Sequence, residues 1–136
     1  MSEPMPLRPP ETAEIYVIDD DPEVGLALGR LLRSAGYSVL SFTSAEAFLF
    51  EHPAPQSGVL ILDVRMPEID GPHLQAILAA RGAATPVLFL SAVDDPRIHE
   101  EVISRGAAGW MTKPVEAEEL LQRVGELLAA GDRART

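Results

Sequence analysis

The chain has 136 residues, 46% of them hydrophobic, which is enough for one domain with a substantial core. Its formal net charge of −10 argues against direct binding to nucleic acid or to an anionic membrane, and favours basic partners or cations. The absence of cysteine excludes disulfides, thiolate zinc sites and a cysteine nucleophile. Because no apolar run is long enough to cross a bilayer and the start lacks an apolar signal region, we expect a cytoplasmic protein.

Three segments are predicted along the chain. Residues 1–12 contain four prolines and are expected to form an extended, disordered arm. Residues 13–130 hold all the periodic apolar patterns and are expected to form the folded domain. Residues 131–136 are polar and are interpreted as a tail or as the start of a linker.

The folded part alternates short β-prone runs with amphipathic helical segments. Strands are predicted at Ile15–Ile18, Tyr37–Ser41, Val59–Leu62, Pro86–Leu90 and Ala108–Thr112, each followed by a helix. Such strict alternation predicts a parallel sheet with helices on both faces. The Val59 and Pro86 runs are uniformly apolar and should be central strands, whereas the more polar Tyr37 run should lie at an edge.

Polar residues follow most of the predicted strands. Asp19 and Asp20 come after the first, Asp63 ends the third, Ser91 ends the fourth and Lys113 follows the fifth. Parallel strands deliver their carboxyl ends to one edge of the sheet, which is where ligands bind in open α/β folds. These side chains, far apart in sequence, are therefore expected to converge.

Three carboxylates in one cleft repel one another. At about 4 Å and an effective dielectric near 20, each pair costs roughly 4 kcal/mol. The single positive charge of Lys113 is too little to balance them, so a divalent cation with oxygen ligands is expected, and Mg²⁺ fits an open site with few protein ligands better than Ca²⁺. A carboxylate nucleophile beside Mg²⁺, a lysine and a hydroxyl suits phosphoryl transfer. The sequence has no glycine-rich phosphate loop, so it gives no indication of a bound nucleotide.

A set of motifs in register carries a family resemblance. They are the acidic pair Asp19-Asp20, Asp63 with Met66-Pro67 and Gly71, Ser91-Ala92, and Lys113-Pro114. In order and spacing over roughly residues 13–130, the chain resembles a receiver domain of bacterial two-component response regulators. It is similar to receivers attached to helix-turn-helix transcription factors of the nitrogen-fixation regulator type. The resemblance implies a flavodoxin-like (βα)5 fold, with a doubly wound five-stranded parallel sheet in the order 2-1-3-4-5.

The resemblance also implies roles for individual residues. Asp63 would be the phospho-acceptor, taking a phosphoryl group from a phosphohistidine of a sensor histidine kinase. Asp20 would ligate Mg²⁺ directly, Asp19 directly or through water, and Asp63 and the backbone carbonyl of Arg65 would complete the protein ligands. Lys113 would contact the phosphoryl oxygens, and the Lys113-Pro114 peptide is often cis in the family.

The remaining implied roles concern the readout. Ser91 would be the switch hydroxyl and would bind the phosphoryl group together with Ala92. Trp110 occupies the switch aromatic position, where Tyr or Phe is usual, so rotation of this ring on activation is in doubt. Phosphorylation is expected to alter the face formed by the Asp95–Arg105 helix, the Ala108–Thr112 strand and the last helix. That face would bind a partner, a second copy of the chain or a DNA-binding output domain that this chain does not include.

Two other readings remain open. Asp19 and Asp21 match the Asp-x-Asp pattern of haloacid-dehalogenase-like phosphohydrolases, although that reading leaves Asp63 and Met66-Pro67 unexplained. The chain could also be a degenerate receiver that acts only as a binding module. In the receiver reading the protein is not a turnover enzyme and catalyses only its own phosphorylation and dephosphorylation.

Several polar residues are given structural rather than functional roles. Asp21 is interpreted as a helix cap because Pro22 follows it. His52, His73 and His99 are scattered over separate elements and are all predicted to be surface residues.

Overall fold

The structure is a computed structural model that describes residues 12–135. The predicted disordered arm lies outside the described residues, apart from Thr12. Within the described range, strands and helices alternate as β1 (Ile15–Ile18), α1 (Pro22–Ser34), β2 (Val39–Phe42), α2 (Ala45–Glu51), β3 (Val59–Asp63), α3 (Gly71–Ala80), β4 (Val87–Ser91), α4 (Pro96–Ser104), β5 (Gly109–Thr112) and α5 (Ala117–Arg135). No helix in that range is both long and apolar enough to cross a membrane.

The sheet is parallel, and its strands follow the order β2-β1-β3-β4-β5. This confirms the predicted topology, including the central position of β3 and the edge position of β2. Strand β2 begins at Val39 rather than at Tyr37, two residues later than predicted. Every residue of β3 and β4 is buried, as their uniformly apolar sequences predicted.

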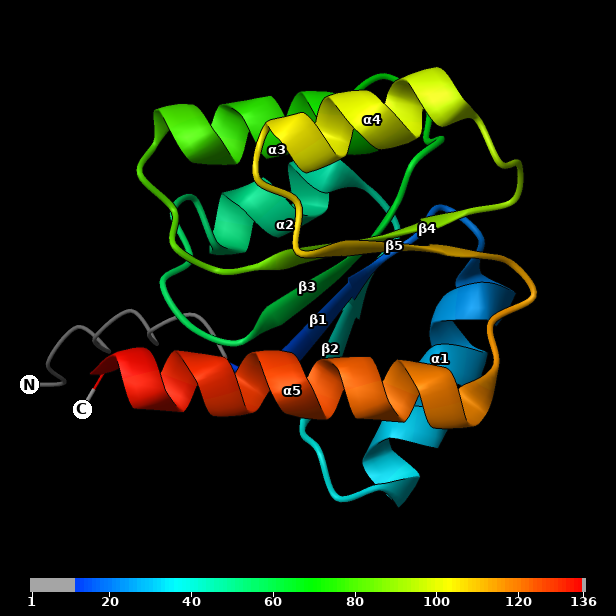
Figure 1. Ribbon diagram of the computed structural model, residues 1–136, viewed down its shortest axis with the longest axis vertical. Coiled ribbons are helices and arrows are strands. Elements are labelled where there is room, and N and C mark those ends of the chain that lie inside the picture. Colours follow the sequence, from blue (N-terminus) through cyan, green and yellow to red (C-terminus); the bar gives the residue numbers. More distant parts are fainter. Residues whose placement is uncertain (1–11, 136) are drawn as a thin grey trace, which may run out of the picture.

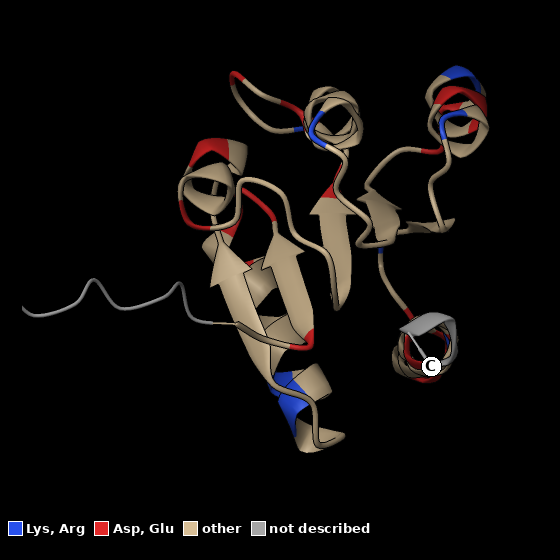
Figure 2. Ribbon diagram, turned by 90° about the vertical axis from the view of Figure 1, so that its left-hand side faces the viewer, with Lys and Arg blue, Asp and Glu red and all other residues tan. Residues whose placement is uncertain are grey.

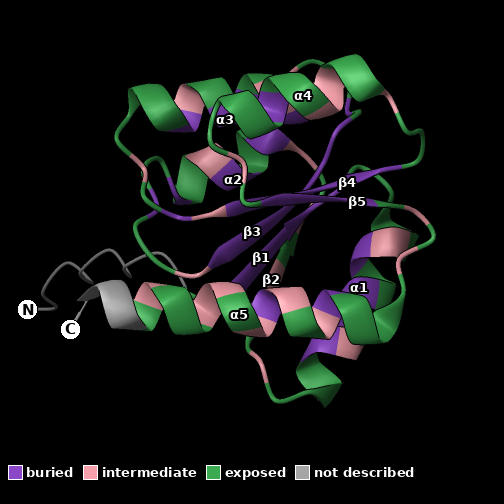
Figure 3. Cartoon of the chain, in the orientation of Figure 1, coloured by how far each residue is buried: buried purple, intermediate pink, exposed green. Residues whose placement is uncertain are grey.

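Helices cover both faces of the sheet (Figure 1). Helices α2, α3 and α4 lie on one face, and α1 and α5 lie on the other. Alternate residues along each strand face the two sides, so the core forms two clusters. One contains Ile18, Leu62 and Phe89 with side chains of α2, α3 and α4, and the other contains Val17 and Ile61 with side chains of α1 and α5. Figure 3 shows the buried strands between the partly exposed helices.

Local sequence signals set most helix boundaries. Asp21, Ser44, Asp70 and Asp95 cap α1 to α4, each accepting a hydrogen bond from a backbone N–H of the first turn. This confirms Asp21 as a cap. After α1, Gly36 adopts a φ of 96°, a conformation that glycine enters without the steric cost of a Cβ.

Helix α5 is longer than the sequence pattern predicted. The residues from Gly131 onward were expected to form a polar tail, but the helix continues through Gly131 to Arg135. Glycine inside a helix costs only about 1 kcal/mol relative to alanine, and the preceding Ala129 and Ala130 strongly favour the helix. A glycine ends a helix reliably only where the backbone needs the left-handed conformation, and Gly131 is not such a position.

Candidate functional site

The acidic residues converge at the carboxyl ends of β1 and β3. Ile18 pairs with Leu62 in the parallel register, so Asp19 and Asp63 leave the sheet side by side. Together with Asp20 they form a cluster in which each offers a carboxylate oxygen, and these oxygens lie within 4.8 Å of one another. Figure 2 shows acidic segments at the tips of the strand arrows and in the loops that follow them. The sequence-based expectation of convergence is met for all three carboxylates.

Lys113 reaches this cluster from the end of β5. Its ammonium group donates to the Asp19 carboxylate at 2.8 Å and lies 3.5 Å from an oxygen of Asp63. Its backbone N–H donates to the carbonyl of Ser91 at 2.8 Å, which fixes the chain next to β4, and the peptide to Pro114 is cis. The shorter contact is with Asp19, so the lysine already has a carboxylate partner before any phosphoryl group is present.

The charges at this site are not balanced. Burial, with a further contribution from the neighbouring Asp19 charge, raises the pKa of Asp63 to about 6, although Lys113 and the backbone N–H of Arg65 act in the opposite direction. Burial alone would lower the pKa of Lys113, but its hydrogen bond to Asp19 and the charges of Asp63 and Asp19 raise it. The single Lys113 ammonium therefore interacts with two buried carboxylates, and the charged form of Asp63 remains less favourable than it would be in water.

The loop after β3 folds tightly over Asp63. The N–H of Gly71 donates to the carbonyl of Val64 at 2.9 Å, and a Cβ on Gly71 would collide with the backbone carbonyl of Asp63 and with the Phe89 ring. This close approach gives the physical reason for the glycine. The Arg65 backbone N–H bonds the Asp63 carboxylate from the same loop. The loop thus shapes the wall of the site as well as connecting β3 to α3.

A shallow groove beside the carboxylates offers room for a cation. It has a volume of about 420 Å³ and is lined by Asp20, Arg65, Met66, Pro67 and Asp70. Asp20 is exposed, whereas Asp19 and Asp63 are buried. A cluster of hard carboxylate oxygens that is open to solvent on one side and short of positive charge fits Mg²⁺ in ligand chemistry. Burial and the neighbouring Asp19 charge raise the pKa of Asp63, so a bound cation would favour its charged form.

Ser91 lies at the end of β4, and its hydroxyl bonds within its own loop. The hydroxyl donates to the carbonyl of Val93 and accepts from the Val93 N–H at 3.2 Å. Ser91 is buried, and Ala92, which follows it, is exposed. The hydroxyl would have to leave the Val93 carbonyl before it could donate to a group on Asp63, a detail that sequence reasoning missed.

Trp110 lies in β5, opposite Phe89 of β4, and is 8% exposed. Its indole stacks on the imidazole of His99 from α4, with ring centroids 4.7 Å apart and an angle of 6° between the planes. The Phe89 ring lies 6.3 Å away. Trp110 is therefore part of the core between the sheet and α4.

The prediction that all three histidines are surface residues is wrong for His52. This residue is 8% exposed and stacks on Phe48 with ring centroids 5.4 Å apart, and Tyr16 lies 4.7 Å away. His52 follows Phe48 by four residues and caps the end of α2, and this spacing, which brings the two rings together, is a signal that the sequence offered. His99 is half-buried because of its stacking on Trp110, and only His73 is fully exposed.

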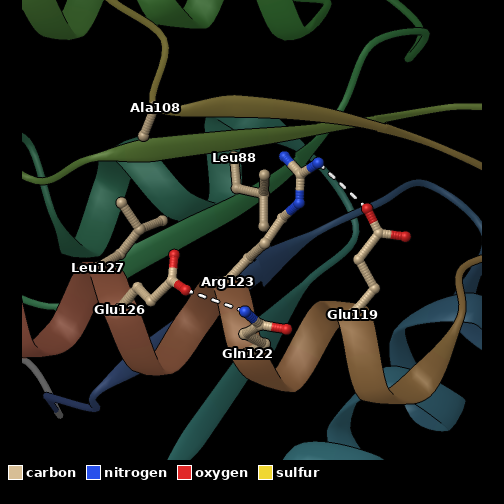
Figure 4. Close-up of a pocket in the computed structure, with 7 residues that line it drawn as sticks. All are labelled: Leu88, Ala108, Glu119, Gln122, Arg123, Glu126 and Leu127. Atoms are coloured by element: carbon tan, nitrogen blue, oxygen red, sulfur yellow. Dashed lines mark hydrogen bonds and ion pairs between the residues drawn. The ribbon is translucent and has the colours of Figure 1, made fainter.

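A second cleft lies away from the acidic cluster. It has a volume of about 380 Å³ and is lined by Leu88, Ala108, Glu119, Gln122, Arg123, Glu126 and Leu127 (Figure 4). It lies between α5 and the amino-terminal parts of β4 and β5. Arg123 pairs with Glu119 at 3.1 Å, and Gln122 donates to Glu126 at 3.2 Å. The predicted site residues are all elsewhere.

The chain belongs to the family of response regulator receiver domains. The model of that family matches residues 15–125. The parallel order of the strands and the acidic cluster at their carboxyl ends agree with this assignment. The family's members are signalling proteins of two-component systems.

Relatives with known names support the assignment. The chain is 40% identical over 122 residues to the response regulator protein TodT of Pseudomonas putida, covering 90% of this chain and 54% of that protein. It is 34% identical to the transcriptional regulatory protein FixJ of Bradyrhizobium diazoefficiens, covering 88% of this chain and 58% of that protein. The chain thus spans about half the length of these relatives.

Solved structures agree in fold. The response regulator StyR matches with a TM-score of 0.82 at 36% identity, covering 89% of this chain and 61% of that one. Full-length FixJ from B. japonicum matches with a TM-score of 0.83 at 33% identity, covering 90% of this chain and 61% of that one. These similarities confirm the flavodoxin-like receiver fold.

Proposed function

We propose that this domain is a phosphorylation-dependent switch whose phospho-acceptor is Asp63 and whose phosphodonor is a phosphohistidine of a sensor histidine kinase. The observation that carries the proposal is the buried Asp63 carboxylate at the end of the central strand, with its pKa raised to about 6 and Lys113 3.5 Å away. A cation bound beside this carboxylate would offset its charge, and the same cation and Lys113 would then stabilise a phosphoryl group on Asp63.

In the proposed transfer, a carboxylate oxygen of Asp63 attacks phosphorus. The P–N bond to the imidazole breaks, and its electron pair leaves with the imidazole, so that an acyl phosphate forms on Asp63. The Lys113 ammonium, already beside Asp63, contacts the phosphoryl oxygens and offsets their charge. Mg²⁺, when held by Asp19, Asp20, Asp63 and the carbonyl of Arg65, would neutralise charge on the transferring group.

The proposed readout begins at Ser91. Its hydroxyl exchanges the Val93 carbonyl for a phosphoryl oxygen, and the backbone N–H of Ala92 donates to the same group. The loop from Ala92 to Asp95 moves with it and displaces α4, so that the face formed by α4, β5 and α5 changes shape. The unphosphorylated domain samples this state, and phosphorylation shifts the population toward it.

The changed face is proposed to bind a partner. Because the named relatives include transcriptional regulators of which the match covers only 51% and 58%, a DNA-binding output domain or a second receiver is the proposed partner. Val93 and Ile103 expose 54% and 42% of their surfaces on the α4 side, which gives that face apolar area to cover.

The test is labelling with a small-molecule phosphodonor in the presence of Mg²⁺. The wild-type protein should gain one phosphoryl group by intact mass, and Asp63→Asn should gain none. Glu46→Gln, which removes one charge from an exposed position on α2, is the matched control and should label like the wild type. Equal labelling of Asp63→Asn would refute the proposal.

The same samples separate the two alternatives. A phosphohydrolase would release phosphate from a small phosphoester through many turnovers, but Asp21, which that reading requires in the site, caps α1 by accepting from the Glu23 N–H at 2.9 Å. A degenerate receiver would neither label nor bind Mg²⁺. Single-equivalent labelling excludes both.

A further inference from the structure

Trp110 is enclosed by rings on two elements. His99 of α4 lies flat on the indole at 4.7 Å, and Phe89 of β4 lies 6.3 Å away at an angle of 34°. Together with the neighbouring core residue Val102, these rings leave the indole 8% exposed. The indole can therefore reach solvent only if His99 or α4 moves.

The buried position of Trp110 has an energetic cost. The indole N–H is buried and has no hydrogen-bond acceptor among the described residues. A buried donor without a partner loses the hydrogen bond that water would give it outside. The indole stays inside because stacking and apolar burial outweigh this loss. The stability of the buried position therefore depends on the groups that pack against the indole, above all the His99 imidazole.

The state of Ser91 differs from that of Trp110. The Ser91 hydroxyl bonds the Val93 carbonyl and so is turned to its own loop, while Trp110 is already buried. In this structure the aromatic ring is thus inside although the switch hydroxyl is not engaged with Asp63. Burial of the ring does not depend on movement of Ser91.

We propose that His99 is a positioning residue that holds Trp110 in its buried site whether or not Asp63 carries a phosphoryl group. A displacement of α4 that keeps this stack in place leaves the indole inside, and the signal then passes through the Ala92–Asp95 loop and α4 without rotation of the aromatic ring. The claim for the phosphorylated state rests on the proposed function, whereas the claim for the unphosphorylated state does not.

The size of the effect follows from the stack. Aromatic pairs contribute about 0.5–1.5 kcal/mol beyond area burial, which at about 1.36 kcal/mol per tenfold corresponds to about a 2- to 12-fold change in the equilibrium between buried and exposed indole. Removal of the imidazole should therefore raise the exposed fraction of Trp110 by about that factor.

Trp110 is the only tryptophan in the chain, so its fluorescence reports on this position alone. Acrylamide quenching of the full chain should be weak for the wild type. His99→Ala should raise the quenching constant about 2-fold or more, and His99→Phe, which restores a ring, should return it to the wild-type value. His73→Ala, at the exposed histidine of α3, is the control and should leave it unchanged. His99→Leu, which keeps volume without a ring, replaces His99→Ala if that variant does not fold by far-UV circular dichroism.

The second arm adds beryllofluoride and Mg²⁺, with binding followed by fluorine NMR on the same sample. The wild-type quenching constant should stay the same when beryllofluoride is bound, and only the ring-less variants should show a change. If wild-type Trp110 becomes accessible on binding, or if the ring-less variants quench like the wild type, His99 does not have this role. If beryllofluoride fails to bind at all, the proposed function fails, and the comparison of His99→Ala with His99→Phe still decides the role of His99.

Discussion

The acidic cluster and the Trp110 stack lie near the same edge of one sheet, but different forces hold them. At the cluster, two buried carboxylates share one lysine, and the pKa of Asp63 is raised to about 6. At the stack, apolar packing encloses Trp110 and charge plays little part. The cluster keeps an excess of negative charge that a cation can offset, whereas the stack contributes stability to the face that must transmit the change. The following substitutions test that contrast.

Trp110→Ala should have the largest effect on stability. Removing a buried indole leaves a cavity next to Phe89 and His99, and such truncations cost about 3–5 kcal/mol of unfolding free energy. Denaturant unfolding followed by far-UV circular dichroism measures the loss, because the fluorescent residue is gone. Trp110→Phe keeps a ring and should lose much less. A loss under about 1 kcal/mol for Trp110→Ala would show that the indole is not part of the core.

Lys113→Ala should destabilise the acidic cluster in the presence of a metal chelator. The Asp19 side chain is 2% exposed and accepts from Lys113 at 2.8 Å, so loss of the ammonium leaves a buried carboxylate unpaired. Hydrogen bonds to charged groups contribute about 1.5–3 kcal/mol, and we expect a loss of that size in unfolding free energy. Added Mg²⁺ should recover part of it. An unchanged stability would mean that the carboxylates are balanced without the lysine.

Asp63→Asn should change stability in the opposite direction. The raised pKa means that the folded state binds a proton more tightly than the unfolded chain, whose Asp has a pKa near 3.8, so wild-type stability should fall as the pH rises from about 4 through 6. Above pH 6 the variant should therefore be more stable by about 1–3 kcal/mol in chelator, and below pH 4 the gain should vanish. Unfolding curves at pH 4, 6 and 8 check this. A gain that is constant across pH would assign it to something other than the charge.

The amino-acid sequence predicted the acidic cluster but not the stacking of His99 on Trp110, and the reason for this difference is physical. Asp19, Asp63 and Lys113 are each placed by the end of a strand, and parallel strands bring their ends together whatever the details of packing. The stack of His99 on Trp110 depends on how α4 is rotated against β5, which no local pattern specifies. For His52 the spacing to Phe48 was a signal in the sequence, but the ring of Tyr16 in β1 that lies beside it could not be placed from a local pattern.

The partners of local side-chain hydrogen bonds were the second feature that could not be predicted from the sequence. A serine at a strand end can bond forward into its loop or across to a neighbouring site, and the choice of Val93 by Ser91 depends on the turn that follows. The length of α5 was also missed, because residues 131–136 are polar and were interpreted as a tail, although the residues before them favour helix. Elements and strand order are thus more predictable than side-chain partners.

Arg123→Ala should have the smallest effect, and it gives the surface counterpart of Lys113→Ala. Arg123 pairs with Glu119 at 3.1 Å, but both side chains are 40% or more exposed, so water and salt screen the pair and an (i, i+4) pair of this kind contributes about 0.3–0.5 kcal/mol. Unfolding free energies at low and high salt should differ little between the variant and the wild type, and any difference should shrink as salt rises. A loss as large as that of Lys113→Ala would mean that the aliphatic stem of Arg123, whose guanidinium group lies near Gly109, supports the sheet independently of the charge. Glu119→Gln, which removes the partner and leaves that stem in place, separates the two contributions.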